Sequence, residues 1–255
     1  MQKFIDIFSD AGQQQLKAFL NHKNDVLFAF DFDGTLAPIV DDPNNAVMTP
    51  EVFERIGLLA QRKKTVILTG RSVEDVKKRL PSEVFNIIGS HGMEGHPDVS
   101  DEFLVSAKKT ATTWKAQLSS QTDGLHRVWI EDKGFSLAVH YRMRASSHDL
   151  PAKIQNICRS LSPAPEIILG KNVINLIPNG MPNKLGAILA VMKSQKLKKA
   201  FFIGDDITDE FIFAAKNKDI FSIKVGSNPH LSAEYYINTQ PEIQRLLDFL
   251  LENTK

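Results

Sequence analysis

The chain has 255 residues, of which 42% are hydrophobic and 24% are charged. This is the composition of a soluble globular protein, and the length favours one domain that carries an insert. The formal net charge is +1, and the basic residues are spread among the acidic ones. Because they form no basic stripe, the sequence argues against a nucleic-acid groove or a membrane surface. We expect a monomer whose partner is a small molecule.

Cysteine usage and the N-terminal segment bear on the compartment. Cys158 is the only cysteine, so no internal disulfide can form. A single cysteine suits a reducing compartment, although secreted proteins can lack disulfides too. The opening residues MQKFIDIFSDAGQQ interrupt their apolar positions with Asp6 and Asp10 and show no signal-peptide core. No apolar run approaches the roughly 18 residues of a spanning helix, and we expect a cytoplasmic protein.

The first part of the chain alternates helical and strand patterns. The expected elements are a helix at 13–20, a strand at 26–30, a helix from 50, a strand at 64–68 and a helix from 73. Thr49 and Pro50 supply an N-cap and a first-turn proline, and Ser72 with Asp75 resembles a capping box. The helix from 50 has four apolar residues at helical spacing, namely Phe53, Ile56, Leu59 and Ala60. This rhythm is typical of a parallel α/β sheet.

The middle part has a different order of elements. A helix at 102–121 precedes a hairpin at 128–142, and a helix at 150–161 precedes a second hairpin at 166–178. In the first hairpin Phe135, Leu137, Val139 and Tyr141 alternate with Ser136, Ala138, His140 and Arg142, which indicates a half-exposed antiparallel strand. The pattern predicts a small α+β unit.

The α/β rhythm returns in the last part. We expect a helix at 184–195, a strand at 200–203, a helix from 208, a strand at 221–226 and a closing amphipathic helix from 241. The sequence therefore predicts an α/β fold: a doubly wound parallel-sheet (Rossmann-like) core domain, residues 1–100 and 179–255, with an inserted α+β cap domain, residues 101–178.

Polar residues follow the ends of the predicted parallel strands. In open α/β sheets, ligands bind in the crevice just outside the carboxyl ends of the strands. The polar residues are Asp31 and Asp33 after the first strand, Thr69 after the second, Asp205, Asp206 and Asp209 after a later one, and Lys184 at a helix start between them. Five carboxylates converging on one edge repel one another, and a divalent cation removes the conflict. Oxygen ligands without histidine or cysteine favour Mg²⁺, which commonly also binds a substrate phosphate.

Roles follow from this placement. Asp31 is positioned to attack phosphorus and form an aspartyl-phosphate, and Asp33 projects to the same side as an acid and base. Thr69, Lys184 and the backbone N–H groups of 32–35 can hold the phosphate charge. Each piece alone has an ordinary structural explanation, since the late acids suit a helix start and Lys184 suits a solvated helix. Their ordered coincidence at strand ends favours phosphoryl chemistry.

DFDGT at 31–35, Thr69, Lys184 and GDDITDE at 204–210 resemble the haloacid-dehalogenase-like phosphotransferase superfamily. The resemblance implies Asp31 as nucleophile, Asp33 as acid/base, and Thr69, Gly70 and Lys184 as phosphate-binding residues. It also implies Mg²⁺ bound by Asp31, by Asp33 through its backbone carbonyl, and by Asp205. Asp206 and Asp209 would then lie next to these ligands without contacting the ion themselves.

DFDGTLAPIV, LTGRS, GSHGMEG, EDKGFSLAVHYR, GKNV and GDDITDE together resemble the trehalose-6-phosphate phosphatase family over nearly the whole chain from about residue 26. The resemblance implies a cap that closes over the sugar. The residues implied to face the substrate are Arg71, His91, Gly92, Glu94, Glu131, Lys133 and Arg142. The chain has Asn175 where many members carry Glu, and Leu185 where they carry Gly after the lysine; the first bears on sugar preference.

Other interpretations stay open at this point. The same mechanism suits another sugar phosphate, such as sucrose phosphate or mannosylglycerate phosphate, and a phospho-aspartate can also serve a mutase. Phosphorylation-switched receiver modules share an acidic Mg²⁺ site with Thr and Lys, but their acids come as an adjacent pair on the first strand. In the hairpin, His140 and Arg142 can be ordinary exposed residues, and Lys133-Gly134 can simply form its turn. Arg71 can contact substrate or pair with a neighbouring acid.

Overall fold

The computed structural model describes residues 4–21, 25–84, 86–141, 149–170, 172–227 and 232–254. The chain divides into two compact units: Met1–Asp98 with Pro182–Lys255, here called the core unit, and Val99–Met181, here called the inserted unit. Within the described ranges, no helix is both long and apolar enough to cross a membrane.

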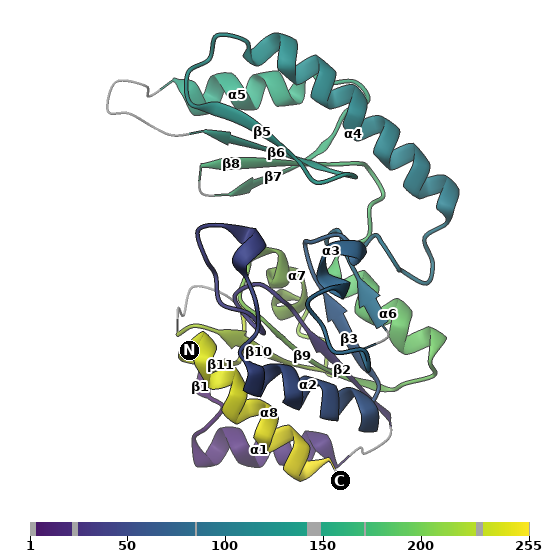
Figure 1. Cartoon of the computed structure of the whole chain (residues 1–255), viewed down its shortest axis with the longest axis vertical. Helices are drawn as coiled ribbons and strands as arrows, with labels where there is room; N and C mark the ends of the chain where they lie inside the picture. Colours follow the sequence, from purple (N-terminus) through teal and green to yellow (C-terminus); the bar gives the residue numbers. More distant parts are fainter. Residues whose placement is uncertain are drawn as a thin grey trace. The chain divides into compact units, whose positions relative to one another are not determined.

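The core unit is built on a seven-stranded sheet in which every strand pair is parallel (Figure 1). The strand order is β1 (Ile5–Asp6), β11 (Tyr235–Ile237), β10 (Ile220–Val225), β9 (Lys199–Gly204), β2 (Val26–Phe30), β3 (Thr65–Leu68) and β4 (Asn86–Ile88). The adjacent strands β2 and β9 come from the two sides of the insertion in the sequence, so both flanking segments build one sheet. The expected doubly wound parallel sheet is confirmed.

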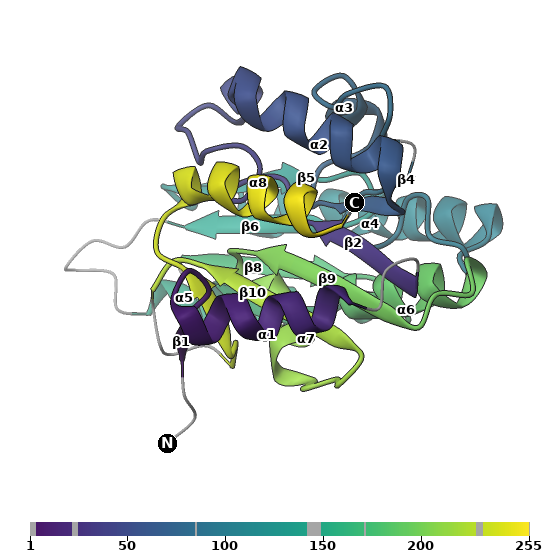
Figure 2. The ribbon, with the colours of Figure 1, turned by 90° about the horizontal axis from the view of Figure 1, so that it is seen from below.

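Helices cover both faces of this sheet. Its α-helices are α1 (Asp10–Leu20), α2 (Pro50–Arg62), α3 (Val73–Lys77), α6 (Lys184–Ser194), α7 (Glu210–Ala214) and α8 (Ile243–Asn253), and its 3₁₀ turns are η2 (Pro43–Asn45), η3 (Ile207–Asp209) and η4 (Gln240–Glu242). The helices α1, α2 and α8 contribute to one apolar cluster, and α6 and α7 contribute to the other. Figure 2 shows this unit from below.

Strand β2 explains why the sequence reads as a continuous apolar run. Phe28 and Phe30 point into the cluster with α1, α2 and α8, whereas Leu27 and Ala29 point into the cluster with α6 and α7. Successive side chains of a strand point to opposite faces, and both faces are covered here. All five residues of β2 are consequently buried, and the first polar side chain after them lies at the end of the sheet.

The inserted unit has a four-stranded antiparallel sheet with two helices. The strand order is β5 (Val128–Asp132), β6 (Leu137–Tyr141), β8 (Val173–Ile177) and β7 (Glu166–Gly170), and the helices are α4 (Asp101–Thr122) and α5 (Leu150–Arg159). Trp114 of α4, Ile154 of α5 and Val139 of β6 lie in its apolar cluster. The expected helix-hairpin-helix-hairpin order is confirmed.

Several local expectations are corrected by the structure. The core sheet contains β1, β4 and β11, which the sequence did not indicate because strands of two or three residues carry no readable alternation. Phe53 of α2 is 43% exposed, and Val52 takes the buried position instead. Ala138, expected on the open side of its strand, is fully buried.

Candidate active site

The end of β2 places Asp31 against a buried lysine. Lys184 Nζ donates to Asp31 Oδ1 at 2.8 Å and to Asp209 Oδ1 at 2.6 Å. Lys184 is 2% exposed, and Asp209 is fully buried. Because removing charges from water costs free energy unless they are paired, these three residues depend on one another. The structure thus brings together the end of β2, the start of α6 and the GDDITDE segment.

Burial and neighbouring charges shift the pKa values of this cluster. Burial, together with the carboxylates of Asp209 and Asp205, raises the pKa of Asp31 well above its ordinary value, and Lys184 opposes the shift. Burial disfavours the Lys184 ammonium, but Asp209 and Asp31 outweigh it and raise the Lys184 pKa. Burial, Asp209 and Asp206 raise the pKa of Asp205 to about 6. The carboxylates therefore carry more negative charge than one lysine neutralises.

The unsatisfied oxygens indicate where a cation fits. Asp31, Asp205 and Asp209 each offer one oxygen, and these atoms lie within 4.8 Å of one another. Asp205 Oδ1 is buried without a hydrogen-bond partner among the described residues. The backbone of Gly34 adopts a φ of +75°, and a Cβ there would overlap the Asp205 carboxylate. A hard cation with oxygen ligands fits this arrangement, because it would satisfy an oxygen that lacks a hydrogen-bond partner among the described residues.

Local capping sets the positions of Lys184 and Asp209. Asn183 accepts from the Gly186 N–H at 2.9 Å and so starts α6 directly at Lys184. Asp206 accepts from the Ile207 N–H at 2.6 Å, while its own N–H donates to Asp209 Oδ2 at 3.0 Å. This reciprocal capping box leaves Asp209 Oδ1 for Lys184. Asp206 therefore orients the loop, whereas Asp209 contacts the lysine directly.

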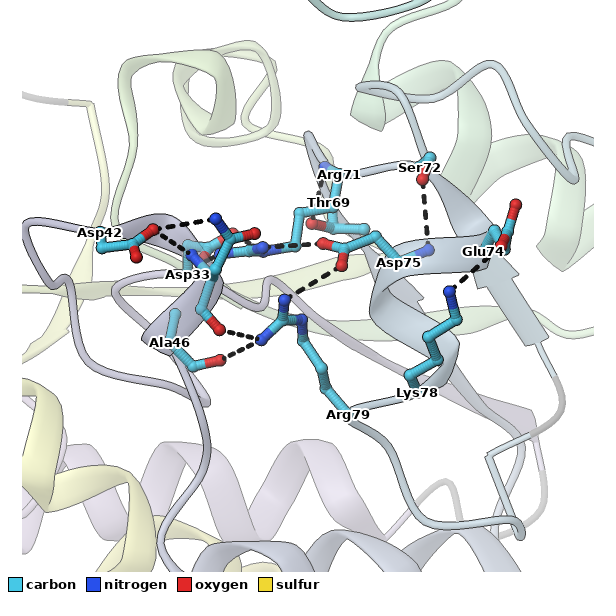
Figure 3. Close-up of polar contacts among 11 residues, drawn as sticks. Asp33, Asp42, Ala46, Thr69, Arg71, Ser72, Glu74, Asp75, Lys78 and Arg79 are labelled. Carbon is cyan, nitrogen blue, oxygen red and sulfur yellow. Dashed lines mark hydrogen bonds and ion pairs between the residues drawn. The ribbon is translucent and has the colours of Figure 1, made fainter.

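Asp33 lies in a different set of contacts from the other carboxylates. Arg71 Nε donates to Asp33 Oδ2 at 2.8 Å, and Arg71 Nη2 donates to Asp33 Oδ1 at 2.7 Å (Figure 3). The Asp33 side chain is 39% exposed. Asp33 is not among the three carboxylates that converge. Arg71, expected to face substrate, is here a bidentate partner of Asp33.

Thr69, Gly70 and His91 form a tightly packed turn after β3. Thr69 is fully buried, and its Oγ1 accepts from the Arg71 N–H at 3.1 Å. The His91 N–H donates to the Thr69 carbonyl at 2.9 Å. A Cβ on Gly70 would run into the His91 ring. Glycine is therefore required directly after Thr69, where the strand end meets the loop that carries His91.

Gly92 and Glu94 serve the structure of the core unit. A Cβ on Gly92, whose φ is +121°, would press against the backbone of Asn183, which caps α6. Glu94 Oε2 accepts from the Val73 N–H at 2.6 Å, and Glu94 Oε1 accepts from Ser90 Oγ at 3.1 Å. Both carboxylate oxygens of Glu94 thus have partners within the core unit.

The structure also corrects the capping box expected at α3. Ser72 Oγ accepts from the Asp75 N–H at 3.2 Å, as expected for an N-cap. The Asp75 carboxylate does not complete the box, because it accepts from Arg71 at 2.8 Å and from Arg79 at 3.0 Å. Pairing with two guanidinium groups replaces the expected contact with a backbone N–H.

The expected sugar-binding residues of the hairpin lie in the inserted unit. Glu131 Oε2 lies 2.8 Å from His140 Nε2. The His140 ring stacks on Trp129, with centroids 4.8 Å apart and an interplanar angle of 6°. Lys133 lies in the hairpin connection, where its N–H donates to the Ser136 carbonyl at 3.0 Å. Arg142 lies outside the described residues.

Comparison with known proteins identifies the family. The sequence profile described as trehalose-phosphatase matches residues 29–241. Trehalose-phosphate phosphatase B of Arabidopsis thaliana is 27% identical over 99% of this chain and 70% of its own length. The trehalose-phosphate phosphatase of Mycobacterium ulcerans is 32% identical over 78% of this chain, which spans about half (53%) of that relative.

Solved structures agree with the sequence comparison. A trehalose-6-phosphate phosphatase related protein is similar with a TM-score of 0.68 and 27% identity, covering 89% of this chain and 97% of the other. Since the family profile covers well over half of the residues, including both strand ends with carboxylates, the chain belongs to the trehalose-phosphatase family of phosphatase enzymes.

Proposed function

We propose that this protein hydrolyses trehalose 6-phosphate to trehalose and phosphate, the last step of trehalose biosynthesis, in a Mg²⁺-dependent reaction with an aspartyl-phosphate intermediate. The observation that carries the proposal is the buried Asp31–Lys184–Asp209 cluster at the end of β2. The proposed substrate is inferred from the relatives that are named trehalose-phosphate phosphatases. A buried carboxylate oriented by a neighbouring lysine suits a nucleophilic aspartate.

The nucleophile is Asp31. One of its oxygens attacks phosphorus, so that an oxygen–phosphorus bond forms as the bond to the sugar oxygen breaks. Lys184 holds Asp31 in place and offsets negative charge, and Thr69 supplies a hydroxyl to a phosphate oxygen. The buried setting strengthens these interactions because little water screens them.

Asp33 moves the proton in both halves of the reaction. It donates a proton to the departing sugar oxygen, and it then takes a proton from the water that attacks the acyl phosphate. Hydrolysis releases inorganic phosphate and regenerates the Asp31 carboxylate. In this proposal, one Asp33 oxygen exchanges its hydrogen bond with Arg71 for the reacting oxygen in either transfer.

Asp31 and Asp205 would hold Mg²⁺ through their side chains, with Asp33 contributing its backbone carbonyl. Asp209 lies close enough to support the ion, and its contact with Lys184 fixes its orientation. When bound, Mg²⁺ offsets the charge of the phosphate and of the acidic cluster. The orphaned Asp205 oxygen and the space provided by Gly34 support this assignment.

The inserted unit supplies the sugar contacts in this proposal. Glu131, Lys133 and Arg142 would bind hydroxyl groups and the phosphate, and Asn175 would tune the preference among sugars. Asn175 pairs with Ala138 in the sheet register, on the strand next to the hairpin that carries Glu131. Within the core unit, Arg71 and the segment 91–94 complete the proposed substrate contacts.

Phosphate release decides the proposal. Trehalose 6-phosphate is compared with glucose 6-phosphate, sucrose 6-phosphate and mannosylglycerate phosphate, each with Mg²⁺ and with a chelator. We expect rapid, metal-dependent release from the trehalose ester alone. Equal release from all four esters would support the phosphatase chemistry but contradict trehalose 6-phosphate as the specific substrate. No release from any of them would contradict the phosphatase proposal itself.

A further inference from the structure

A chain of four alternating charges begins at Asp33 and runs away from the acidic cluster. Arg71 holds both oxygens of Asp33, and Arg71 Nη1 donates to Asp75 Oδ2 at 2.8 Å. Asp75 Oδ1 accepts in turn from Arg79 Nη2 at 3.0 Å. These four residues, here called the relay, are drawn in Figure 3. None of the contacts beyond Arg71 follows from the chemistry assigned to the site.

The relay is anchored to backbone at its far end. Arg79 Nη1 donates to the carbonyls of Asn44 at 2.9 Å and Ala46 at 3.1 Å. Both belong to the segment that follows the strand end bearing Asp33, and one lies in η2. Arg79 therefore ties α3 and its following turn to the loop between Asp33 and α2.

The two arginine side chains of the relay are shielded from water, whereas its two carboxylates are more exposed. The Arg71 and Arg79 side chains are 11% and 13% exposed, while Asp33 and Asp75 are 39% and 37% exposed. Burial raises the pKa of Asp75, but the hydrogen bonds from Arg71 and Arg79 outweigh it and lower the pKa overall. Asp75 therefore stays ionised and supplies Arg71 with a counter-charge that is independent of Asp33.

We propose that Asp75 and Arg79 are positioning residues that hold the Arg71 guanidinium in place, so that Asp33 can exchange its bond to Arg71 for the leaving oxygen of the substrate. This rests on the proposed function of Asp33. When Asp33 turns away, the partly buried Arg71 cation loses the charge of that carboxylate, which is costly. Asp75 reduces that cost, and because one of its oxygens accepts from Arg71 Nη1 while the other accepts from Arg79 Nη2, it keeps Arg71 in place while Asp33 moves.

Two substrates with different leaving groups distinguish this positioning role from general support of the fold. A sugar alkoxide needs a proton as it departs, whereas a nitrophenolate does not, and kcat/KM reports only the steps up to acyl-phosphate formation. We expect Asp75→Asn to lower kcat/KM about 10- to 100-fold for trehalose 6-phosphate, the range that a misplaced catalytic group produces. For p-nitrophenyl phosphate we expect little change. An equal loss for both substrates would overturn the proposal.

A double-mutant cycle tests the route through Arg71. Asp75→Asn in an Arg71→Met background is expected to cause no further loss with trehalose 6-phosphate, because the group through which Asp75 acts is gone. Full additivity of the two losses would overturn the relay. Glu74→Gln is the matched control, since Glu74 lies on the same helix in an exposed i,i+4 pair with Lys78 at 3.1 Å. It is expected to leave both substrates unaffected.

A readout without turnover keeps the two proposals distinguishable. If Asp75→Asn fails to fold, Arg79→Gln removes the next member and is expected to show the same substrate dependence in weaker form. If the wild-type protein hydrolyses neither ester, the proposed function fails, and NMR exchange of the Arg71 Nη1 protons, which donate to Asp75, decides the anchoring. Slow exchange in the wild type that becomes fast in the variant supports the relay, and unchanged exchange overturns it.

Discussion

Replacing Lys184 by Met should destabilise the metal-free protein more than any exposed lysine replacement. The change removes two hydrogen bonds between charged groups, at 2.8 Å to Asp31 and 2.6 Å to Asp209. Each such bond contributes about 1.5–3 kcal/mol. Breaking a buried ion pair from one side costs about 3–5 kcal/mol, because the remaining charge stays buried. We therefore expect the free energy of unfolding to fall by about 3–5 kcal/mol.

Urea denaturation of both proteins in a chelator measures this loss directly. Lys199→Met is the control, since Lys199 Nζ forms a more exposed pair with Asp219 at 2.8 Å. That pair should contribute less than about 1 kcal/mol. Mg²⁺ should restore part of the loss in Lys184→Met, because a cation bound by the carboxylates replaces some of the missing positive charge. A loss no larger than that of the control would refute the reasoning.

Further predictions concern the acidic edge. Asp31→Asn should lower kcat about 10³-fold or more by removing the nucleophile, with near-native circular dichroism, and normal turnover would exclude the covalent route. Asp205→Asn should abolish the rise in Tm that Mg²⁺ causes; an unchanged rise would place the ion elsewhere. In the wild type, calorimetric Mg²⁺ affinity should weaken as the pH falls below about 6, where Asp205 takes up a proton. Because folding raises this pKa from about 4, the metal-free protein should lose stability as the pH rises from about 4 to 6, whereas a flat Tm would contradict the shift. Gly34→Ala should destabilise by about 1–3 kcal/mol through its positive φ and the contact with Asp205, which thermal unfolding tests against Gly124→Ala, another positive-φ position where a Cβ meets nothing within 4 Å.

The local signals in the sequence were sufficient for the fold class. The apolar run of β2, buried on both faces, is typical of a parallel sheet that is covered on both sides. Thr49, Ser72 and Asn183 are side-chain caps that begin α2, α3 and α6. These features depend on residues within four positions of one another, so they can be read along the chain. The shortest strands were not predicted from the sequence, because pairing with neighbouring strands, rather than their own residues, defines them.

The candidate site likewise depends partly on local sequence patterns and partly on contacts between distant segments. The sequence by itself determined that carboxylates, a threonine and a lysine follow strand ends or open helices, since each depends on a local pattern. Only the tertiary structure decided which acid pairs with which cation. Lys184 selects Asp31, 153 positions away, and Asp209, 25 positions away, while Arg71 takes Asp33 across 38 positions. The reason is physical: the strength of an ion pair depends on distance and burial, and both are set by how distant segments pack rather than by the residues themselves.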